Sequence, residues 1–259
     1  MAGNNHLILQ PRDRAFLREL AILRVVDHEQ ARRVAGFGST SRANKRLLKL
    51  VRAGLLRRFF LGSGGGRKAL YSLSEKGAFA ADVPFRGLRR KQGAVIAMDF
   101  FVEHQLAVNG IFLAARFEKS PSPEIRFVHW MGFHAPLAPE LRLIPDGYVE
   151  FAIPSGVTAL FFEVDLGTES QKVWQEKTRQ YVQLAVSGAF RRTFGHDRFR
   201  VLVVANSARR LESIRKTVAG VTEKIFRFAT LDDALAQFFA PVWMKPVGSK
   251  AESLFESQP

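Results

Sequence analysis

The sequence predicts a protein of the α/β class with two domains, and three observations predict it. Residues 1–92 carry a net charge of +14 and residues 93–259 carry +1, so the excess positive charge belongs to one part of the chain. Within that basic part, three helical patterns are followed by two strand patterns that a glycine-rich turn joins. The rest of the chain alternates strands and helices with a core order of α-β-β-β-α-β. We therefore expect a small basic domain followed by a larger, nearly neutral α/β domain.

The composition of the 259 residues excludes several classes of protein. Because the chain contains no cysteine, it forms no disulfide, holds no cysteine-ligated zinc and has no thiol nucleophile. No run of residues reaches the roughly 18 apolar side chains that span a bilayer. The first residues also lack the basic and then apolar order of a signal peptide. We therefore expect a cytoplasmic protein with no membrane partner.

The basic domain, residues 1–82, is predicted to begin with three helices. The first starts at Pro11, and the second occupies residues 28–35. Two glycines then leave a tight turn before the third helix, residues 39–52. The third helix has one apolar stripe, and its opposite face carries side chains that can reach a ligand, namely Arg42, Asn44, Lys45, Lys49 and Arg52.

A β-hairpin is predicted to follow the third helix. Residues 55–61 and 69–73 have strand character, and the glycines of residues 62–66 supply the turn between them. The hairpin adds further basic side chains, which are Arg57 and Arg58 on its first strand and Arg67 and Lys68 at its tip. A phosphate-binding loop is excluded, because Arg67 stands where both the Walker A and the dinucleotide patterns need glycine.

The order of these elements, with the closing segment YSLSEKG at residues 71–77, resembles the winged helix-turn-helix domains of bacterial DNA-binding proteins. A helix with cations three or four residues apart can lie along a groove of double-stranded DNA, and the hairpin can reach phosphates beside it. Arg42 and Asn44 could also contact guanine and adenine, although phosphate is the more frequent target of such side chains. The alternative is a solvated basic surface without a ligand. Residues 83–93 are predicted to form a basic linker that can follow the DNA backbone.

The second domain is predicted to occupy residues 94–245. We expect a helix over residues 94–109 and, directly after it, a strand over residues 111–117. The remaining elements expected are strands over residues 143–153, 159–166, 199–205 and 224–229 and helices over residues 170–187 and 208–219. The tail, residues 246–259, is predicted to be disordered because it is mainly polar.

Acidic side chains inside two predicted strands indicate a site. Asp146 lies on the strand over residues 143–153, and Glu163 and Asp165 share one face of the next strand. Buried carboxylates are costly without a partner cation. The apolar stripe of the following helix contains Lys177 and Tyr181, so we expect Lys177 to point inward.

Two interpretations of this cluster stay open. In the first, carboxylates hold Mg²⁺, for which Mn²⁺ can substitute, and the metal with Lys177 stabilises charge on a phosphate during phosphodiester cleavage. In the second, Lys177 forms a structural ion pair with Glu163 or Asp165 and no chemistry occurs. Tyr181 is likewise either a nucleophile for covalent nicking or a core tyrosine, whose position its helical spacing alone explains.

The pair Pro145-Asp146, with Glu163-Val164-Asp165 one strand later, resembles the restriction-endonuclease-like superfamily of PD-(D/E)xK nucleases. In that superfamily the lysine stands two residues after the glutamate, where this chain has Asp165, so Lys177 would act from the neighbouring helix. The longer pattern resembles the replication-relaxation family more specifically, through PDGY at residues 145–148, FEVD at residues 162–165, Thr168-Glu169, Lys177, Tyr181 and EHQLAVN at residues 103–109.

The resemblance to this family implies that Asp146 and Glu163 bind the metal, with Glu103 as a third acid from a helix. It implies a protein of a plasmid or other mobile element that acts in replication or DNA relaxation and is similar to some mobilisation relaxases. Its protein partners would be replication or mobilisation proteins and, because winged-helix proteins often dimerise, a second copy of the chain. We therefore predict a Mg²⁺-dependent nicking enzyme or endonuclease. The alternative is a non-catalytic regulator of replication or transcription whose nuclease-like domain is degenerate.

Overall fold

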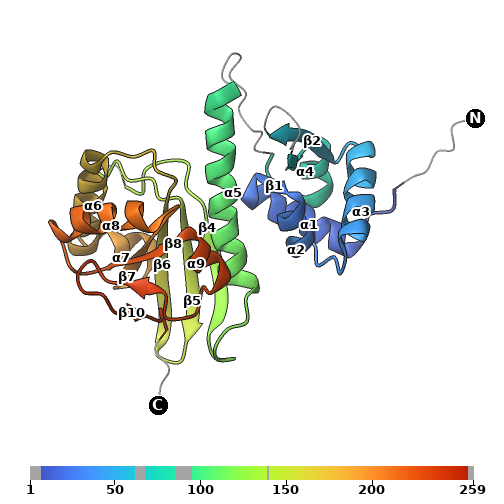
Figure 1. Cartoon of the computed structure of the whole chain (residues 1–259). Helices are drawn as coiled ribbons and strands as arrows, with labels where there is room; N and C mark the ends of the chain where they lie inside the picture. The colour runs from blue at the N-terminus through green and yellow to red at the C-terminus, as the bar shows by residue number, and fades with distance from the viewer. Residues whose placement is uncertain (1–6, 62–67, 86–94, 139, 256–259) are drawn as a thin grey trace, which may run out of the picture. The chain divides into compact units, whose positions relative to one another are not determined.

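The computed structural model of the chain describes residues 7–61, 68–85, 95–138 and 140–255 (Figure 1). The chain forms two compact units, Met1–Leu113 and Ala114–Pro259, and each contains one β-sheet with helices beside it. The fold is therefore of the mixed α/β class, as predicted. Most of the predicted linker over residues 83–93 lies outside the described residues, so the predicted domain limits stay a prediction. Among the described residues, no helix has both the length and the apolar character that crossing a bilayer requires.

The first unit combines a three-stranded antiparallel sheet, with the order β1-β3-β2, and helices. Its elements in chain order are α1 (Pro11–Leu23), β1 (Val25–Asp27), α2 (His28–Val34), α3 (Thr40–Arg52), β2 (Leu56–Leu61), β3 (Lys68–Leu73), α4 (Glu75–Ala81) and α5 (Val95–Phe117), whose last residues belong to the second unit. The predicted hairpin is thus β2 with β3, and β1 is an edge strand that the sequence patterns do not predict.

Local sequence explains where the helices of the first unit begin. Pro11 occupies the first turn of α1, where its missing N–H has no intrahelical partner to lose. The helices α2, α3 and α4 each start after a side chain that accepts a hydrogen bond from a backbone N–H of the first turn. Those capping side chains are Asp27, Ser39 and Ser74. The three helices predicted in the basic domain are confirmed as α1, α2 and α3, whereas α4 was not predicted.

The strand predicted over residues 111–117 is wrong, because α5 continues to Phe117 without a break. Residues 111–115 are all apolar and all buried, so this segment shows neither the alternation of a strand nor the polar face of a surface helix. A short apolar run of this kind suits a buried strand and a buried helix equally well.

Both apolar and polar contacts bind α5 to the first sheet. Val102 and Leu106 pack against apolar residues of the sheet. The buried side-chain amide of Asn109 donates hydrogen bonds to the backbone carbonyls of Leu23 and Val25, at the junction of α1 and β1. Those bonds satisfy carbonyl groups that burial removes from water. The part of α5 up to Leu113 thus belongs to the first unit.

The second unit contains a mixed sheet with the order β10-β9-β8-β7-β6-β5-β4 among its described residues. The strands β6, β7 and β8 are parallel, and the other neighbours are antiparallel. After α5 the elements are β4 (Arg126–Met131), β5 (Gly147–Ile153), β6 (Gly156–Asp165), α6 (Gln171–Val186), α7 (Ala189–Phe194), β7 (Phe199–Ala205), α8 (Ala208–Ala219), β8 (Phe226–Thr230), α9 (Leu231–Ala236), β9 (Trp243–Met244) and β10 (Ala251–Glu252). The first strand after the helix is therefore β4, and not residues 111–117.

The tail predicted to be disordered is ordered as far as residue 255. Ala251 and Glu252 pair with β9, and the side chains of Leu254 and Phe255 are buried. A two-residue strand shows no alternation that a sequence pattern could reveal, so this part of the prediction is wrong. Residues 256–259 lie outside the described residues.

The two faces of this sheet have different surroundings. The face that contains Phe161 packs against α6 and α8 in one apolar core, and Figure 1 shows these helices together on one side of the strands. Glu163 and Asp165 follow Phe161 at intervals of two, so they share that face. By the same alternation, Arg200 on β7 and Arg227 on β8 point to the opposite face.

Candidate functional site

The exposed face of α3 carries the side chains that the sequence predicts to contact DNA. Ala43, Leu47 and Leu50 are buried, whereas the predicted contact residues of this helix are all exposed: Arg42, Asn44, Lys45, Lys49 and Arg52. Within the described part of the chain, Arg46 forms an ion pair and the other cations of α3 do not. No described carboxylate therefore neutralises this basic face.

Arg46 has a structural role that the sequence patterns did not assign. Its guanidinium forms two hydrogen bonds with the carboxylate of Asp13, one of them from Nε at 2.9 Å, and a third with the carbonyl of Ile8 at 2.9 Å. The side chain of Asp13 is only 1% exposed, so this pair is shielded from water. Arg46 thus ties α3 to α1 and leaves the outer face of α3 to the other cations.

The basic side chains of the hairpin differ in their surroundings. Arg57 and Arg58 on β2 are exposed, and each guanidinium lies near an aromatic ring. Lys68 pairs with the carboxylate of Asp27 at 2.6 Å, so its charge already has a partner. Arg67 lies outside the described residues. Among the predicted hairpin contacts that the structure describes, Arg57 and Arg58 are therefore the ones left available.

In the second unit, a polar cluster surrounds the buried carboxylate of Glu163 on β6. Nζ of Lys177, on α6, lies 2.8 Å from Glu163 Oε2, and the hydroxyl of Tyr181 donates to Glu163 Oε1 at 2.6 Å. Asp146, just before β5, accepts a hydrogen bond from the backbone N–H of Val164 at 2.8 Å, and its charge acts on both Glu163 and Lys177. The structure therefore brings Asp146, Glu163 and Lys177 together, and Lys177 points inward as predicted.

Glu169 is a member of this cluster for which the sequence patterns gave no role. Its Oε1 atom lies 2.7 Å from Nζ of Lys177, so the lysine bridges Glu163 and Glu169. Its Oε2 atom is buried and has no hydrogen-bond partner among the described residues. Two signals in the sequence pointed to Glu169, namely its place in the family-like pattern and its position next to Ser170. Ser170 caps α6 and thereby places Glu169 beside the first turns of that helix.

The charges of the cluster shift the pKa values of its members. Burial raises the pKa of the Glu163 carboxyl to about 7, although the charge of Lys177 lowers it. Burial alone would lower the pKa of the Lys177 ammonium, but the negative charges of Glu163, Glu169 and Asp146 outweigh this effect and raise that pKa. Lys177 is therefore a fixed cation at neutral pH, suited to stabilise negative charge and unsuited to accept a proton.

Asp165 shares the face of β6 with Glu163, but its partners lie outside this cluster, and its role as a metal ligand stays a prediction. Its carboxylate accepts two hydrogen bonds from Arg210 at 2.9 and 2.7 Å and one from the indole N–H of Trp174 at 2.8 Å. The backbone N–H of Gly167 supplies another at 2.6 Å. Both oxygens are thus engaged within the fold. The cation that pairs with the buried Asp165 is Arg210 on α8. Of the two ion pairs that the structural interpretation allowed for Lys177, the structure contains the one with Glu163.

The surroundings of Tyr181 argue against its candidate role as a nucleophile. Its side chain is fully buried, and its ring packs against Phe161 and Phe226. Burial and the charge of Glu163 raise the pKa of its hydroxyl well above the ordinary value. A nucleophile must reach the phosphate and lose its proton. The geometry instead favours the core interpretation, and the hydroxyl in addition holds Glu163 by its hydrogen bond.

The carboxylate oxygens of the cluster are the kind of ligand that a hard divalent cation such as Mg²⁺ prefers. Mg²⁺ in proteins is commonly held by one or two carboxylates with water and substrate phosphate, and Asp146 and Glu163 would be that pair. The unpartnered Oε2 of Glu169 adds a third oxygen near Lys177. Among the described residues, however, no group of three or more histidine, aspartate or glutamate side chains is arranged to hold a metal ion. Glu103, the predicted third acid, is exposed on α5 in the first unit.

Comparison with known proteins assigns the chain to a family. The family model described as Replication-relaxation matches residues 17–197, more than two thirds of the 259 residues. The match includes α3 and every member of the Glu163 cluster, whereas Arg210 lies beyond it. The chain matches no curated protein and no solved structure. Because the family model covers most of its length, the chain belongs to the replication-relaxation family.

Proposed function

We propose that this protein binds double-stranded DNA through a winged helix-turn-helix in its first unit, with α3 as the recognition helix. Membership of its family indicates a role in replication or mobilisation. The observation that carries the proposal is the exposed face of α3, where no described carboxylate pairs with Arg42, Lys45, Lys49 or Arg52. Cations free of internal partners can neutralise phosphates, which supplies most of the affinity for a duplex. Arg57 and Arg58 would extend the contact onto the hairpin of β2 and β3.

The charge-reversal variant Lys45→Glu/Lys49→Glu is expected to weaken duplex binding by roughly 100-fold at about 0.1 M salt, because two phosphate contacts become repulsive. Affinity should also depend less on salt: the slope of log affinity against log salt should become less negative by about two. Fluorescence anisotropy with a labelled duplex at several salt concentrations measures both quantities. The matched control is Lys216→Glu/Lys224→Glu, which reverses two exposed lysines of the second unit. Equal losses in the two variants would mean that net charge, and not α3, governs binding.

A second function, Mg²⁺-dependent cleavage of a phosphodiester bond, is favoured by the Glu163 cluster. Its support is the convergence of Asp146 and Glu163 with Lys177, beside an unpartnered oxygen of Glu169. When bound, Mg²⁺ would polarise the phosphate and activate a water molecule. Asp146 and Glu163 would hold it, and Lys177 would stabilise the charge that develops on the phosphate. Apart from the short helix α7 before β7, the order α5, β4, β5, β6, α6 and β7 is the predicted α-β-β-β-α-β order. This order supports the likeness to restriction endonucleases, with the lysine supplied from α6.

Asp146→Ala is expected to reduce Mg²⁺-dependent nicking of a supercoiled plasmid that carries the native locus by about 100-fold or more, since a metal ligand is lost. Gel separation of supercoiled and open-circular plasmid measures the rate. Asp232→Ala, the same change at an exposed position of α9, is the control and should nick like the native protein. If the native protein binds its site tightly and does not nick, the chain is the non-catalytic regulator, and the DNA-binding proposal stands without this one.

A further inference from the structure

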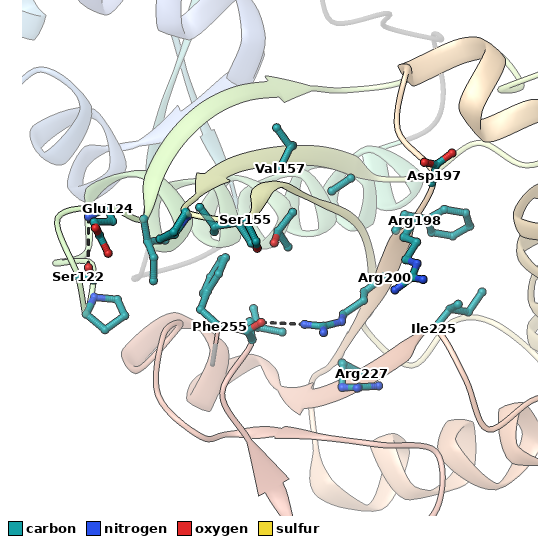
Figure 2. Close-up of a pocket in the computed structure, with 18 of the residues that line it drawn as sticks. Ser122, Glu124, Ser155, Val157, Asp197, Arg198, Arg200, Ile225, Arg227 and Phe255 are labelled. Carbon is teal, nitrogen blue, oxygen red and sulfur yellow. Dashed lines mark hydrogen bonds between the residues drawn. The ribbon is translucent and has the colours of Figure 1, made fainter. Parts of the chain in front are cut away.

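A pocket of about 1040 Å³ lies in the second unit, at the opposite end of β6 from the Glu163 cluster (Figure 2). Its walls include the turn between β5 and β6 and the first residues of β7 and β8. Arg200 and Arg227 point into it from the sheet face opposite to α6, whereas Glu163 and Lys177 lie on the α6 side. The pocket is therefore separate from the site described above.

Arginines dominate one side of this pocket. Figure 2 shows Arg198, Arg200 and Arg227 together on one side and Glu124 on the other. Arg200 and Arg227 each donate one hydrogen bond to a backbone carbonyl at 2.8 Å, which leaves further N–H donors on each guanidinium. Within the described residues, none of the three arginines forms an ion pair.

The fold holds Arg200 and Arg227 close together although their charges repel. They lie on the neighbouring parallel strands β7 and β8, one residue from the paired Val201 and Phe226, and both are partly buried. Burial and then the charge of Arg200 lower the pKa of the Arg227 guanidinium. Guanidinium groups nevertheless stay protonated in proteins, so the repulsion persists until an anion offsets it.

The acidic side chains near the pocket do not supply that anion. Asp197 is exposed and pairs with an arginine outside the pocket lining at 3.2 Å. Glu252 partly offsets the effect of Arg200 on Arg227, but its carboxylate pairs with Lys245 at 2.8 Å. Glu124 is exposed, and Figure 2 shows it across the pocket from the arginines. The positive charges of the pocket arginines therefore have no paired carboxylate among the described residues, and an external anion could bind to them.

We propose that this pocket binds the phosphate group of a nucleotide, either free or at the end of a DNA strand. Guanidinium groups match phosphate oxygens with paired N–H donors, which makes arginine the usual residue for phosphate recognition. Apolar side chains also line the pocket, among them Ile153, Val157 and Ile225, and an apolar surface suits a base. The site goes beyond the proposed functions, since neither α3 nor the Glu163 cluster contributes to it.

The binding test uses the full chain and three probes. These are dTMP, a 5′-phosphorylated oligothymidylate of about four nucleotides, and the same oligonucleotide without the phosphate. All titrations are made in the Lys45→Glu/Lys49→Glu background, so that α3 contributes little. We expect Arg200→Gln/Arg227→Gln to weaken binding of the phosphorylated probes by about tenfold or more. Lys224→Gln, an exposed lysine outside the pocket lining, should leave the affinity unchanged.

The outcomes separate the sources of the ligand. Arginine-dependent binding of dTMP supports a free nucleotide, and arginine-dependent binding of the phosphorylated oligonucleotide alone supports a strand end. The proposal is overturned if the unphosphorylated probe binds equally well or if the arginine variant keeps its affinity. These results do not depend on duplex binding by α3 or on nicking, so failure here leaves those proposals intact.

A stability measurement distinguishes a binding residue from a structural one. Because Arg227→Gln removes one of two repelling charges, we expect the ligand-free variant to unfold at a higher temperature than the native chain. Inorganic phosphate, compared with sodium chloride at equal ionic strength, should raise the midpoint of the native chain more than that of the variant. A lower midpoint for ligand-free Arg227→Gln would show that Arg227 stabilises the fold and would overturn the proposal.

Discussion

Arg210→Met is expected to lower the free energy of unfolding of the second unit by about 3 kcal/mol. Asp165 is fully buried, and two of its hydrogen bonds come from Arg210. Methionine offers neither charge nor donor, so the carboxylate would keep only the donors of Trp174 and Gly167. A buried charge without its counterion is strongly destabilising. Because the Arg210 side chain is 19% exposed, water can reach part of the vacated space and limit the loss.

The same ion pair predicts how this difference depends on pH. Burial would raise the pKa of Asp165, but the hydrogen bonds from Arg210, Trp174 and Gly167 outweigh it and hold the pKa below the ordinary value. A carboxyl with a lowered pKa stabilises the fold above its unfolded pKa, and this contribution is lost as the pH falls through the folded pKa. The difference between the native chain and Arg210→Met should therefore be largest at neutral pH and shrink below about pH 4.

Urea unfolding followed by tryptophan fluorescence measures this difference, because Trp130, Trp174 and Trp243 all lie in the second unit. Arg209→Met changes the exposed neighbour of Arg210 on α8 and is the matched control. It should alter the free energy of unfolding by less than about 0.5 kcal/mol. Equal losses in the two variants, or a difference that is the same at every pH, would contradict the role of the Arg210 ion pair.

Gly77→Ala is expected to destabilise the first unit by about 3 kcal/mol or more. A Cβ atom at Gly77, in α4, would lie 2.1 Å from the backbone carbonyl oxygen of Leu55 and 3.1 Å from a methyl group of Leu73. A backbone oxygen cannot rotate away as a side chain can, so α4 must move. That movement would weaken the bond from the N–H of Ser74 to the same Leu55 oxygen and the bond from the Ser74 hydroxyl to the carbonyl of Gly54.

Far-UV circular dichroism and hydrogen exchange of the β2 and β3 amides would measure this loss, since the first unit contains no tryptophan. Gly38→Ala is the control, because a Cβ atom there would meet nothing within 4 Å and the backbone is not in the left-handed region. It should be neutral or slightly stabilising. Wild-type exchange rates in Gly77→Ala would refute the close contact of α4 with Leu55.

The face of α3 could be predicted because all its determinants are local. The capping residue Ser39 fixes where the helix starts, and the apolar residues Ala43, Leu47 and Leu50 fix which face is buried. Given the start of the helix and its buried face, the positions of the cations along the sequence place them on the outer face. The inward position of Lys177 follows from the same kind of argument on α6.

The partners of the acids depend on sheet order, which a sequence pattern does not contain. Arg210 reaches Asp165 across 45 positions of the chain, because β6 and β7 are parallel neighbours and α8 starts just after β7. Nothing in the spacing of either residue indicates that pairing. The predicted strand over residues 111–117 failed for a different reason, since apolar residues without alternation leave the choice of element to tertiary packing.

The ion pair of Asp165 also limits how this sequence can diverge. A substitution of Asp165→Lys would create the glutamate-x-lysine spacing of the restriction-endonuclease-like superfamily in one step. It would, however, set an ammonium against Arg210 and remove the carboxylate that holds Trp174 and the start of α8. The usual spacing is therefore accessible only with compensating changes on α8. Under the proposed cleavage function, a relative that retains Arg210 would therefore keep its lysine on α6, and we expect Lys177 and Arg210 to vary together among relatives.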